Sequence, residues 1–210
     1  MNKPPMMVPT PLPTLIGQRV TLRSFGPEDI TPRYIGWLND PEVVRYSNQR
    51  FLRHDRASGE RYLASFAGSA NLMVKVLLSA SAGTPERAIG TLTAYRSLHH
   101  GTADIGVLIG DREVWGQGLG LDAWRTLCDW LAEQPGLRKL TCGTLSVNRA
   151  MLRLAERAGF SREGSRPAQE LVDGQPVDIV LFGRFTARSA PTQAGLERRG
   201  GVDRRALPRA

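Results

Sequence analysis

The sequence predicts a single α/β domain in which helices flank a mixed sheet. Its 210 residues, 41% of them hydrophobic and 23% charged, suit one globular domain with a sizeable core. The first half has apolar, strand-like runs separated by turns, and the second half alternates strand-like and helix-like segments. This succession is typical of a meander that continues into a partly parallel sheet through βαβ connections.

The N-terminal part is predicted to contain a strand and two helices that lead into a polar loop. Residues 18–25 alternate apolar and polar side chains, as in a half-buried strand. Residues 27–38 form a helical region with acidic residues in its first turn, and Pro41 can open another short helix. Residues 45–54 are polar, basic and aromatic, so we expect a surface loop there.

A helix and a three-stranded meander are predicted next. Residues 56–66 carry apolar side chains at helical spacing. The segments between the strands are rich in residues that favour turns. The three predicted strands cover residues 72–78, 87–95 and 102–109.

Three glycines alternate between the last of these strands and an amphipathic helix that runs to about Gln134. Gly116, Gly118 and Gly120 let successive backbone N–H groups turn toward one point. The first turn of the helix adds unpaired N–H groups and the positive end of its dipole. This arrangement favours a bound phosphate, although a simple turn would also explain the glycines.

The remaining chain is predicted to alternate between strand and helix and to end in a hairpin. Gly159 ends the last predicted helix, and Asp173-Gly174 is a typical hairpin turn. The predicted elements are a strand over residues 139–145, a helix over 147–158, and a hairpin of 160–166 with 177–185.

In this order, the segments resemble the GNAT superfamily of acyl-CoA-dependent N-acetyltransferases. The resemblance rests on Trp-Gly-Gln-Gly-Leu-Gly at 115–120, on the asparagine and Gly-Phe of residues 148–160, and on Asp-Ile-Val-Leu-Phe-Gly at 178–183. It is greatest to the branch with the ribosomal-protein-alanine and spermidine acetyltransferases. It implies a mixed sheet splayed between its fourth and fifth strands, helices on both faces, and acetyl-CoA as the acyl donor.

The resemblance also implies which residues hold the donor. The glycine loop would bind the pyrophosphate through its backbone, and the pantetheine arm would pair with strand backbone in the splayed gap. Trp115 departs from the usual Arg or Gln but matches the aromatic residue of this branch. Asn148 would contact the pantetheine arm, or it could cap its own helix. The donor residues are then Leu108, Ile109, Gly116, Gln117, Gly118, Leu119, Gly120 and Asn148.

Acetyl transfer to an amine needs a proton acceptor, because an alkylammonium has a pKa of about 10.4. Asp104 stands where many members of the superfamily place a glutamate as general base. Aspartate is one methylene shorter, which favours a water relay, and an ordinary strand-end carboxylate is the alternative. Rival carboxylates are Glu113, Glu170 and Asp178, and we interpret Asp178 as structural.

The leaving thiolate lacks its usual proton donor. The family positions for a hydroxyl on the last helix are occupied by Met151 and Ala155, neither of which can donate. Water, Tyr95 or Ser146 could protonate a thiolate, since a thiol has a pKa of only about 8.5. The same departure leaves open a protein that binds CoA without turning it over.

The acceptor end is predicted to involve the polar loop. Arg45, Tyr46 and Arg50 would suit an acceptor that carries phosphate or carboxylate, such as a nucleotide-linked amino sugar. A solvated loop is the alternative, and a protein N-terminus remains a candidate acceptor. A homodimer is compatible with the sequence.

Composition limits the other classes of function. The net charge of +8 is concentrated in residues 186–210, which hold six arginines and two acidic residues. We expect this tail and the proline-rich arm of residues 1–14 to lie outside a domain over 15–185, and nucleic-acid binding is not favoured. The chain contains no apolar run long enough for a membrane span, and we expect a cytoplasmic protein.

The cysteines and histidines do not indicate a metal site. Cys128 and Cys142 fall in a predicted helix and strand, where reduced core thiols are expected. His54, His99 and His100 do not have the spacing of zinc ligands.

Overall fold

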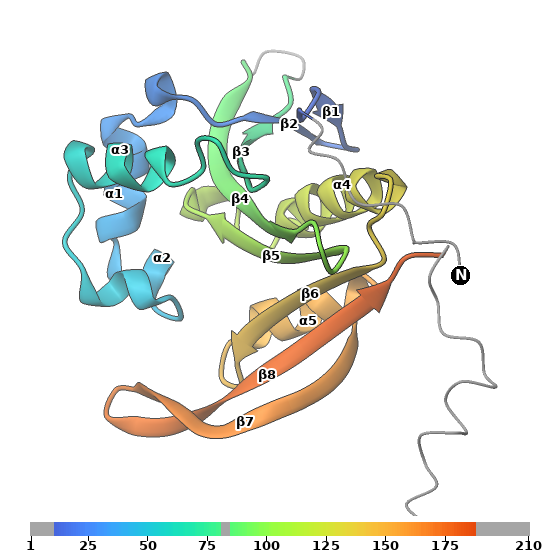
Figure 1. Cartoon of the computed structure of the whole chain (residues 1–210). Helices are drawn as coiled ribbons and strands as arrows, with labels where there is room; N and C mark the ends of the chain where they lie inside the picture. Colours follow the sequence, from blue (N-terminus) through green and yellow to red (C-terminus); the bar gives the residue numbers. More distant parts are fainter. Residues whose placement is uncertain (1–10, 81–84, 188–210) are drawn as a thin grey trace, which may run out of the picture.

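One sheet of eight strands, in the order β1-β2-β3-β4-β5-β6-β8-β7, organises the chain (Figure 1). The computed structural model describes residues 11–80 and 85–187. Neighbouring strands pair antiparallel, except that β5 and β6 are parallel. The strands are β1 (Leu15–Ile16), β2 (Val20–Ser24), β3 (Leu72–Leu78), β4 (Arg87–Ser97), β5 (Thr102–Ile109), β6 (Lys139–Leu145), β7 (Ser161–Val172) and β8 (Gln175–Phe185).

Helices cover both faces of this sheet, as predicted. Alternate strand residues separate the two cores: Val74 packs with α4 and α5, whereas its neighbour Met73 packs with α1. Figure 1 shows α1, α2 and α3 gathered at one side of the strands. The helices are α1 (Pro32–Asn39), α2 (Pro41–Val44), α3 (Arg56–Ala64), α4 (Leu119–Glu133) and α5 (Arg149–Arg157), with short 3-10 turns η1 (Pro27–Asp29), η2 (Asn48–Phe51) and η3 (Arg112–Val114).

The predicted helical region over residues 27–38 is divided in two. η1 ends at Asp29, and α1 starts at Pro32, where a missing N–H costs no helical hydrogen bond. The Thr31 side chain caps α1 by accepting a hydrogen bond from the backbone N–H of Tyr34 at 3.2 Å. Proline therefore sets the start of this helix.

The final hairpin is longer than predicted. β7 continues to Val172, past the predicted end at 166, through two register shifts. The second shift contains Ala168, whose φ of 49° is rare for a residue with a side chain. Asp178 stabilises this bulge because its Oδ1 accepts a hydrogen bond from the Ala168 backbone at 2.9 Å. The predicted turn at Asp173-Gly174 is confirmed, with positive φ at both residues.

The predicted arm and tail lie mostly outside the described residues. At the near end of each, side chains contact the domain. Leu12 packs against the larger core cluster, and the hydroxyl of buried Thr186 donates to the Leu137 carbonyl at 3.2 Å. None of the helices in the described part of the chain is long and apolar enough to cross a membrane.

Candidate active site

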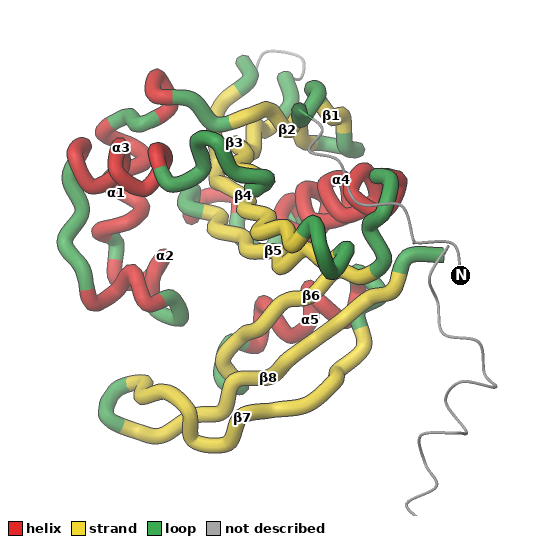
Figure 2. The backbone as a smooth tube through the Cα atoms, viewed as in Figure 1, coloured by secondary structure: helices red, strands yellow, loops and turns green. Residues whose placement is uncertain are grey.

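The parallel strands β5 and β6 separate soon after they begin to pair (Figure 2). Their register covers only residues 102–104 with 139–141, whereas β4 stays paired with β5 as far as Ile109. This is the splay expected between the fourth and fifth predicted strands, which are β5 and β6 in the structure. Beyond Asp104, the edge of β5 that faces β6 therefore has no partner strand within residues 11–80 and 85–187.

A close contact at the end of β5 fixes this edge against α1. A Cβ at Gly110 would lie 2.1 Å from the ring of Trp37, so only glycine fits there. The next residue, Asp111, is buried and accepts hydrogen bonds from the guanidinium groups of Arg33 and Arg87. Its other oxygen caps η3 by accepting from the Glu113 backbone at 3.2 Å. The chain thus enters the glycine loop from a rigid point.

Two of the three glycines lie in the loop, and the third, Gly120, already belongs to the first turn of α4. Gly116 and Gly118 have φ of 76° and 80°, a region that disfavours side chains. A Cβ at either position would meet no atom within 4 Å, so the loop is open on that side. Gly118 precedes α4 without any side-chain cap, which leaves the first N–H groups of the helix available.

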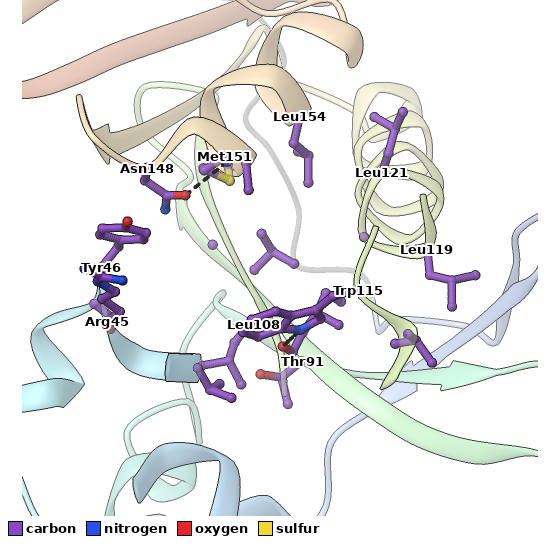
Figure 3. Close-up of a pocket in the computed structure, with 18 of the residues that line it drawn as sticks. Arg45, Tyr46, Thr91, Leu108, Trp115, Leu119, Leu121, Asn148, Met151 and Leu154 are labelled. Carbon is purple, nitrogen blue, oxygen red and sulfur yellow. Dashed lines mark hydrogen bonds between the residues drawn. The ribbon is translucent and has the colours of Figure 1, made fainter. Parts of the chain in front are cut away.

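Trp115 joins the glycine loop to the free edge of β5. Its indole Nε1 donates to the carbonyl of Ile109 at 2.8 Å, a bond visible in Figure 3. The carbonyl of Leu108 instead faces Gly90 in β4. Because backbone groups alternate in direction along a strand, Val107 and Ile109 present theirs to the gap, while Leu108 contributes its side chain.

A cavity of about 840 Å³ joins the glycine loop, the splayed gap and the helices α1, α2 and α3. Of the predicted donor residues, the structure brings all except Gln117 to its wall. The side chain of Gln117 instead donates to the Glu113 carbonyl at 2.9 Å. The lining donor residues are Leu108, Ile109, Gly116, Gly118, Leu119, Gly120 and Asn148.

Asn148 caps α5 and also lines the cavity. Its Oδ1 accepts a hydrogen bond from the Met151 backbone at 3.2 Å, so the capping role is present in the structure (Figure 3). Within the described residues, its amide Nδ2 makes no hydrogen bond. Capping therefore leaves the two amide donors free for a ligand.

Asp104 lies at the last paired position between β5 and β6. Its Oδ2 accepts a hydrogen bond from the hydroxyl of Thr141 at 2.7 Å. Partial desolvation raises the pKa of the Asp104 carboxyl, and the bond from Thr141 lowers it in part. The residue is not in the cavity wall, so a water would have to connect its carboxylate to a bound amine.

The other carboxylates considered as bases have structural partners. Glu113 pairs with Arg87 at 3.6 Å, Glu170 faces Arg50 at 3.7 Å, and Asp178 holds the β7 bulge. None of the three lines the cavity.

Neither hydroxyl that the sequence suggested as a proton donor for the thiolate lies at the cavity. Met151 lines the wall and Ala155 is buried, but neither Tyr95 nor Ser146 reaches the cavity. Instead, Tyr34 and Tyr62 line it, and the hydroxyl of Tyr62 hydrogen-bonds that of Tyr95 at 2.8 Å. Burial raises the pKa of Tyr34 to about 12, so this phenol stays neutral. Helical spacing makes these tyrosines look like ordinary core residues, which is why sequence analysis missed them.

The predicted acceptor residues divide between the cavity and the final hairpin. Arg45 and Tyr46 line the cavity wall. Arg50 is not in that wall, because its guanidinium donates to the Leu171 carbonyl at 3.0 Å.

The cysteines lie in the core. Cys128 and Cys142 are buried and unpaired with each other, and burial raises the pKa of both thiols, that of Cys142 to about 12. Among the described residues, no group of three or more His, Cys, Asp or Glu side chains could hold a metal ion.

Comparison with known proteins agrees with the family resemblance noted in the sequence. Residues 19–161 match the family model described as Acetyltransferase (GNAT) domain. No curated protein sequence matches the chain.

Solved structures share the fold at low sequence identity. A spermidine N-acetyltransferase from Vibrio cholerae, in complex with CoA and spermine, is 18% identical with a TM-score of 0.70 over 80% of this chain and 96% of that one. RimL, a ribosomal L7/L12 alpha-N-protein acetyltransferase in complex with CoA, is 16% identical with a TM-score of 0.68 over 81% and 96%. A GNAT-family acetyltransferase from Bacillus anthracis is 15% identical with a TM-score of 0.68 over 82% and 98%.

Proposed function

The chain belongs to the GNAT acetyltransferase family, and from this premise we propose that it transfers an acetyl group from acetyl-CoA to a primary amine by direct attack. The observation that carries the proposal is the continuous cavity. It runs from an open glycine loop, along an unpaired strand edge, to the helices on the opposite face. Such a cavity can hold a donor and an acceptor at the same time.

The donor would bind through the backbone more than through side chains. The N–H groups of residues 116–120 and the positive end of α4 would hold the pyrophosphate. The pantetheine arm would lie along β5 and pair with the backbone of Val107 and Ile109. The amide of Asn148 would donate to it from the start of α5. Two similar structures contain CoA, which supports this type of donor.

Asp104 would act as the general base through a water. The raised pKa of its carboxyl makes it a better proton acceptor than an ordinary aspartate. The acceptor ammonium would lose a proton to the carboxylate by way of water. The neutral amine would attack the thioester carbonyl, and the C–S bond would break. The amine nitrogen would lose its second proton as this bond breaks, and water would relay that proton to the CoA thiolate, because Met151 and Ala155 cannot donate one.

The acceptor would enter from the side of α1, α2 and α3. Arg45 and Tyr46 would contact it there, and Arg45 would suit an acceptor with a phosphate or carboxylate, such as a nucleotide-linked amino sugar. A protein N-terminus is the other candidate class. Both small amines and protein amines occur as acceptors among the similar structures.

Two measurements test the proposal. Titration with acetyl-CoA by calorimetry should show binding. If no binding is measured at millimolar acetyl-CoA, the proposed donor site is wrong. Release of CoA thiol should depend on an added amine. Slow, amine-independent release over a broad panel would instead favour a non-catalytic acyl-CoA-binding module, the alternative suggested by Met151 and Ala155.

A further inference from the structure

The loop between α2 and the end of η2 forms one wall of the cavity. We call residues 45–51 the strap. Its inner side carries Tyr46, Ser47 and Gln49, all of which line the cavity. In Figure 3, Tyr46 lies on the same side of the cavity as Asn148, at the start of α5. The position of the strap therefore affects the shape of the acceptor end.

The outer side of the strap is tied to the tip of the β7–β8 hairpin. Arg50 Nη2 donates to the Leu171 carbonyl at 3.0 Å and lies 3.7 Å from Oε2 of Glu170. Arg45, which also lines the cavity wall, adds a longer, exposed ion pair to Asp173 at 3.6 Å. The Arg50 side chain is only 15% exposed, so its contacts are screened less than those of Arg45.

Arg50 also holds the strap's own turn. Its Nη1 donates to the Ser47 carbonyl at 2.8 Å, and its guanidinium lies 4.3 Å from the ring centroid of Phe51. One planar guanidinium thus joins two backbone carbonyls from distant parts of the chain. Arginine suits this role because its donors form a rigid fork.

We propose that Arg50 is a positioning residue that fastens the strap to the hairpin tip, and that the fixed acceptor end selects a small amine over a polypeptide N-terminus. A polypeptide that entered between strap and hairpin would have to break these contacts. The cavity of about 840 Å³ must also hold the pantetheine arm, which leaves room of small-ligand size. This inference rests on the proposed function for its second half only.

The first test measures the fastening without any acceptor. Amide hydrogen exchange of residues 45–52 and 170–174 should rise in Arg50→Ala and, to a smaller extent, in Arg50→Lys and Glu170→Gln. Arg53→Ala is the matched control, because Arg53 is exposed and makes no ion pair among the described residues. If exchange in Arg50→Ala equals that of the wild type, Arg50 does not fasten the strap. The milder variants keep this test decisive if Arg50→Ala does not fold.

The second test compares acceptors by thiol release. The probes are spermidine, glucosamine 6-phosphate and a short peptide with a free N-terminus. For the small amine that the wild type acetylates best, Arg50→Ala should raise KM about tenfold, the effect of losing a charged hydrogen bond. The KM for acetyl-CoA should stay unchanged, and the preference for that amine over the peptide should fall.

Three results would overturn the inference. An unchanged acceptor KM despite faster exchange would mean that the strap does not shape the acceptor end. A wild type that prefers the peptide would overturn the substrate class, and so would one that acetylates the peptide but neither small amine. Failure of the proposed function would look different, because acetyl-CoA would then not bind, or thiol release would depend on no amine, the peptide included. The exchange result would still decide the role of Arg50.

Discussion

At the scale of single residues, Asp104 links the proposed chemistry to the stability of the fold. A carboxyl group whose pKa is raised in the folded state binds protons more readily folded than unfolded. Its contribution to stability therefore falls as pH rises from the unfolded pKa through the folded pKa. Above its folded pKa the fold holds an ionised carboxylate at a cost, and that ionised form is the one that can accept a proton.

Asp104→Asn should separate these two effects. We expect thiol release to slow by about a hundredfold, since general-base catalysis supplies about that much. The free energy of unfolding at neutral pH should not fall, because the desolvated charge is removed and the amide can still bond Thr141. Steady-state rates and urea denaturation measure both. Normal rates in this variant would remove Asp104 from the mechanism.

Thr141→Val should change the pH profile without removing the base. The hydroxyl of Thr141 stabilises the ionised carboxylate, so its loss should raise the pKa of Asp104 further. The acidic limb of kcat/KM should then shift to higher pH, while rates on the plateau change little. Profiles of the wild type and the variant, measured in the same buffers, give the shift. A profile in the original place would mean that Asp104 does not set that limb.

Gly118→Ala should weaken CoA binding by straining the loop. A side chain at a φ of 80° costs about 1–2 kcal/mol, and relief of that strain would turn backbone N–H groups away from the cavity. Gly68→Ala is a matched control, since Gly68 has a φ of 67°, equally open surroundings and no part in the cavity. Both variants should lose similar stability in urea. Calorimetry should show that only Gly118→Ala loses affinity for CoA. If Gly118→Ala and Gly68→Ala bind CoA with the same affinity, the result would argue against the proposed phosphate site.

At the scale of elements, most of the sheet follows from the sequence. The observed limits of β3, β5 and β6 agree with those predicted from apolar runs bounded by turns. The two-residue strand β1 was missed. It is too short to show a period, and only its pairing with β2 makes it a strand.

Trp115→Phe should loosen the junction between the glycine loop and β5. Phenylalanine keeps the ring but loses the hydrogen bond from Nε1 to the Ile109 carbonyl, which contributes about 1 kcal/mol. We expect a small loss in the free energy of unfolding and weaker binding of CoA, because loop and strand edge would no longer be held in register. Calorimetry with CoA measures the effect. Full retention of affinity would show that α4 alone positions the loop.

At the scale of the whole molecule, the splayed sheet connects two halves of the site that differ in how far they can be predicted. The donor half uses local motifs at 115–120 and 148–160, which can be recognised in the sequence. The acceptor half depends on contacts between distant segments. Arg50 and Leu171 are 121 residues apart, and no local pattern could show that the hairpin tip, not a substrate, engages this arginine.

The charge of the molecule is likewise divided between domain and tail. Among the described residues, those of both hydrophobic clusters and of the cavity wall lie between Leu12 and Phe182, while six of the arginines lie beyond residue 186. A chain limited to residues 11–187 should therefore unfold cooperatively at the same urea concentration as the full chain and bind CoA with the same affinity. Any non-specific affinity for DNA should fall, and its salt dependence should become shallower, because fewer cations displace counterions. Urea denaturation, calorimetry and DNA binding at two salt concentrations check these points. A drop in CoA affinity would show that the tail contributes to the donor site. If DNA binding is unchanged, the domain and not the tail would be responsible for it.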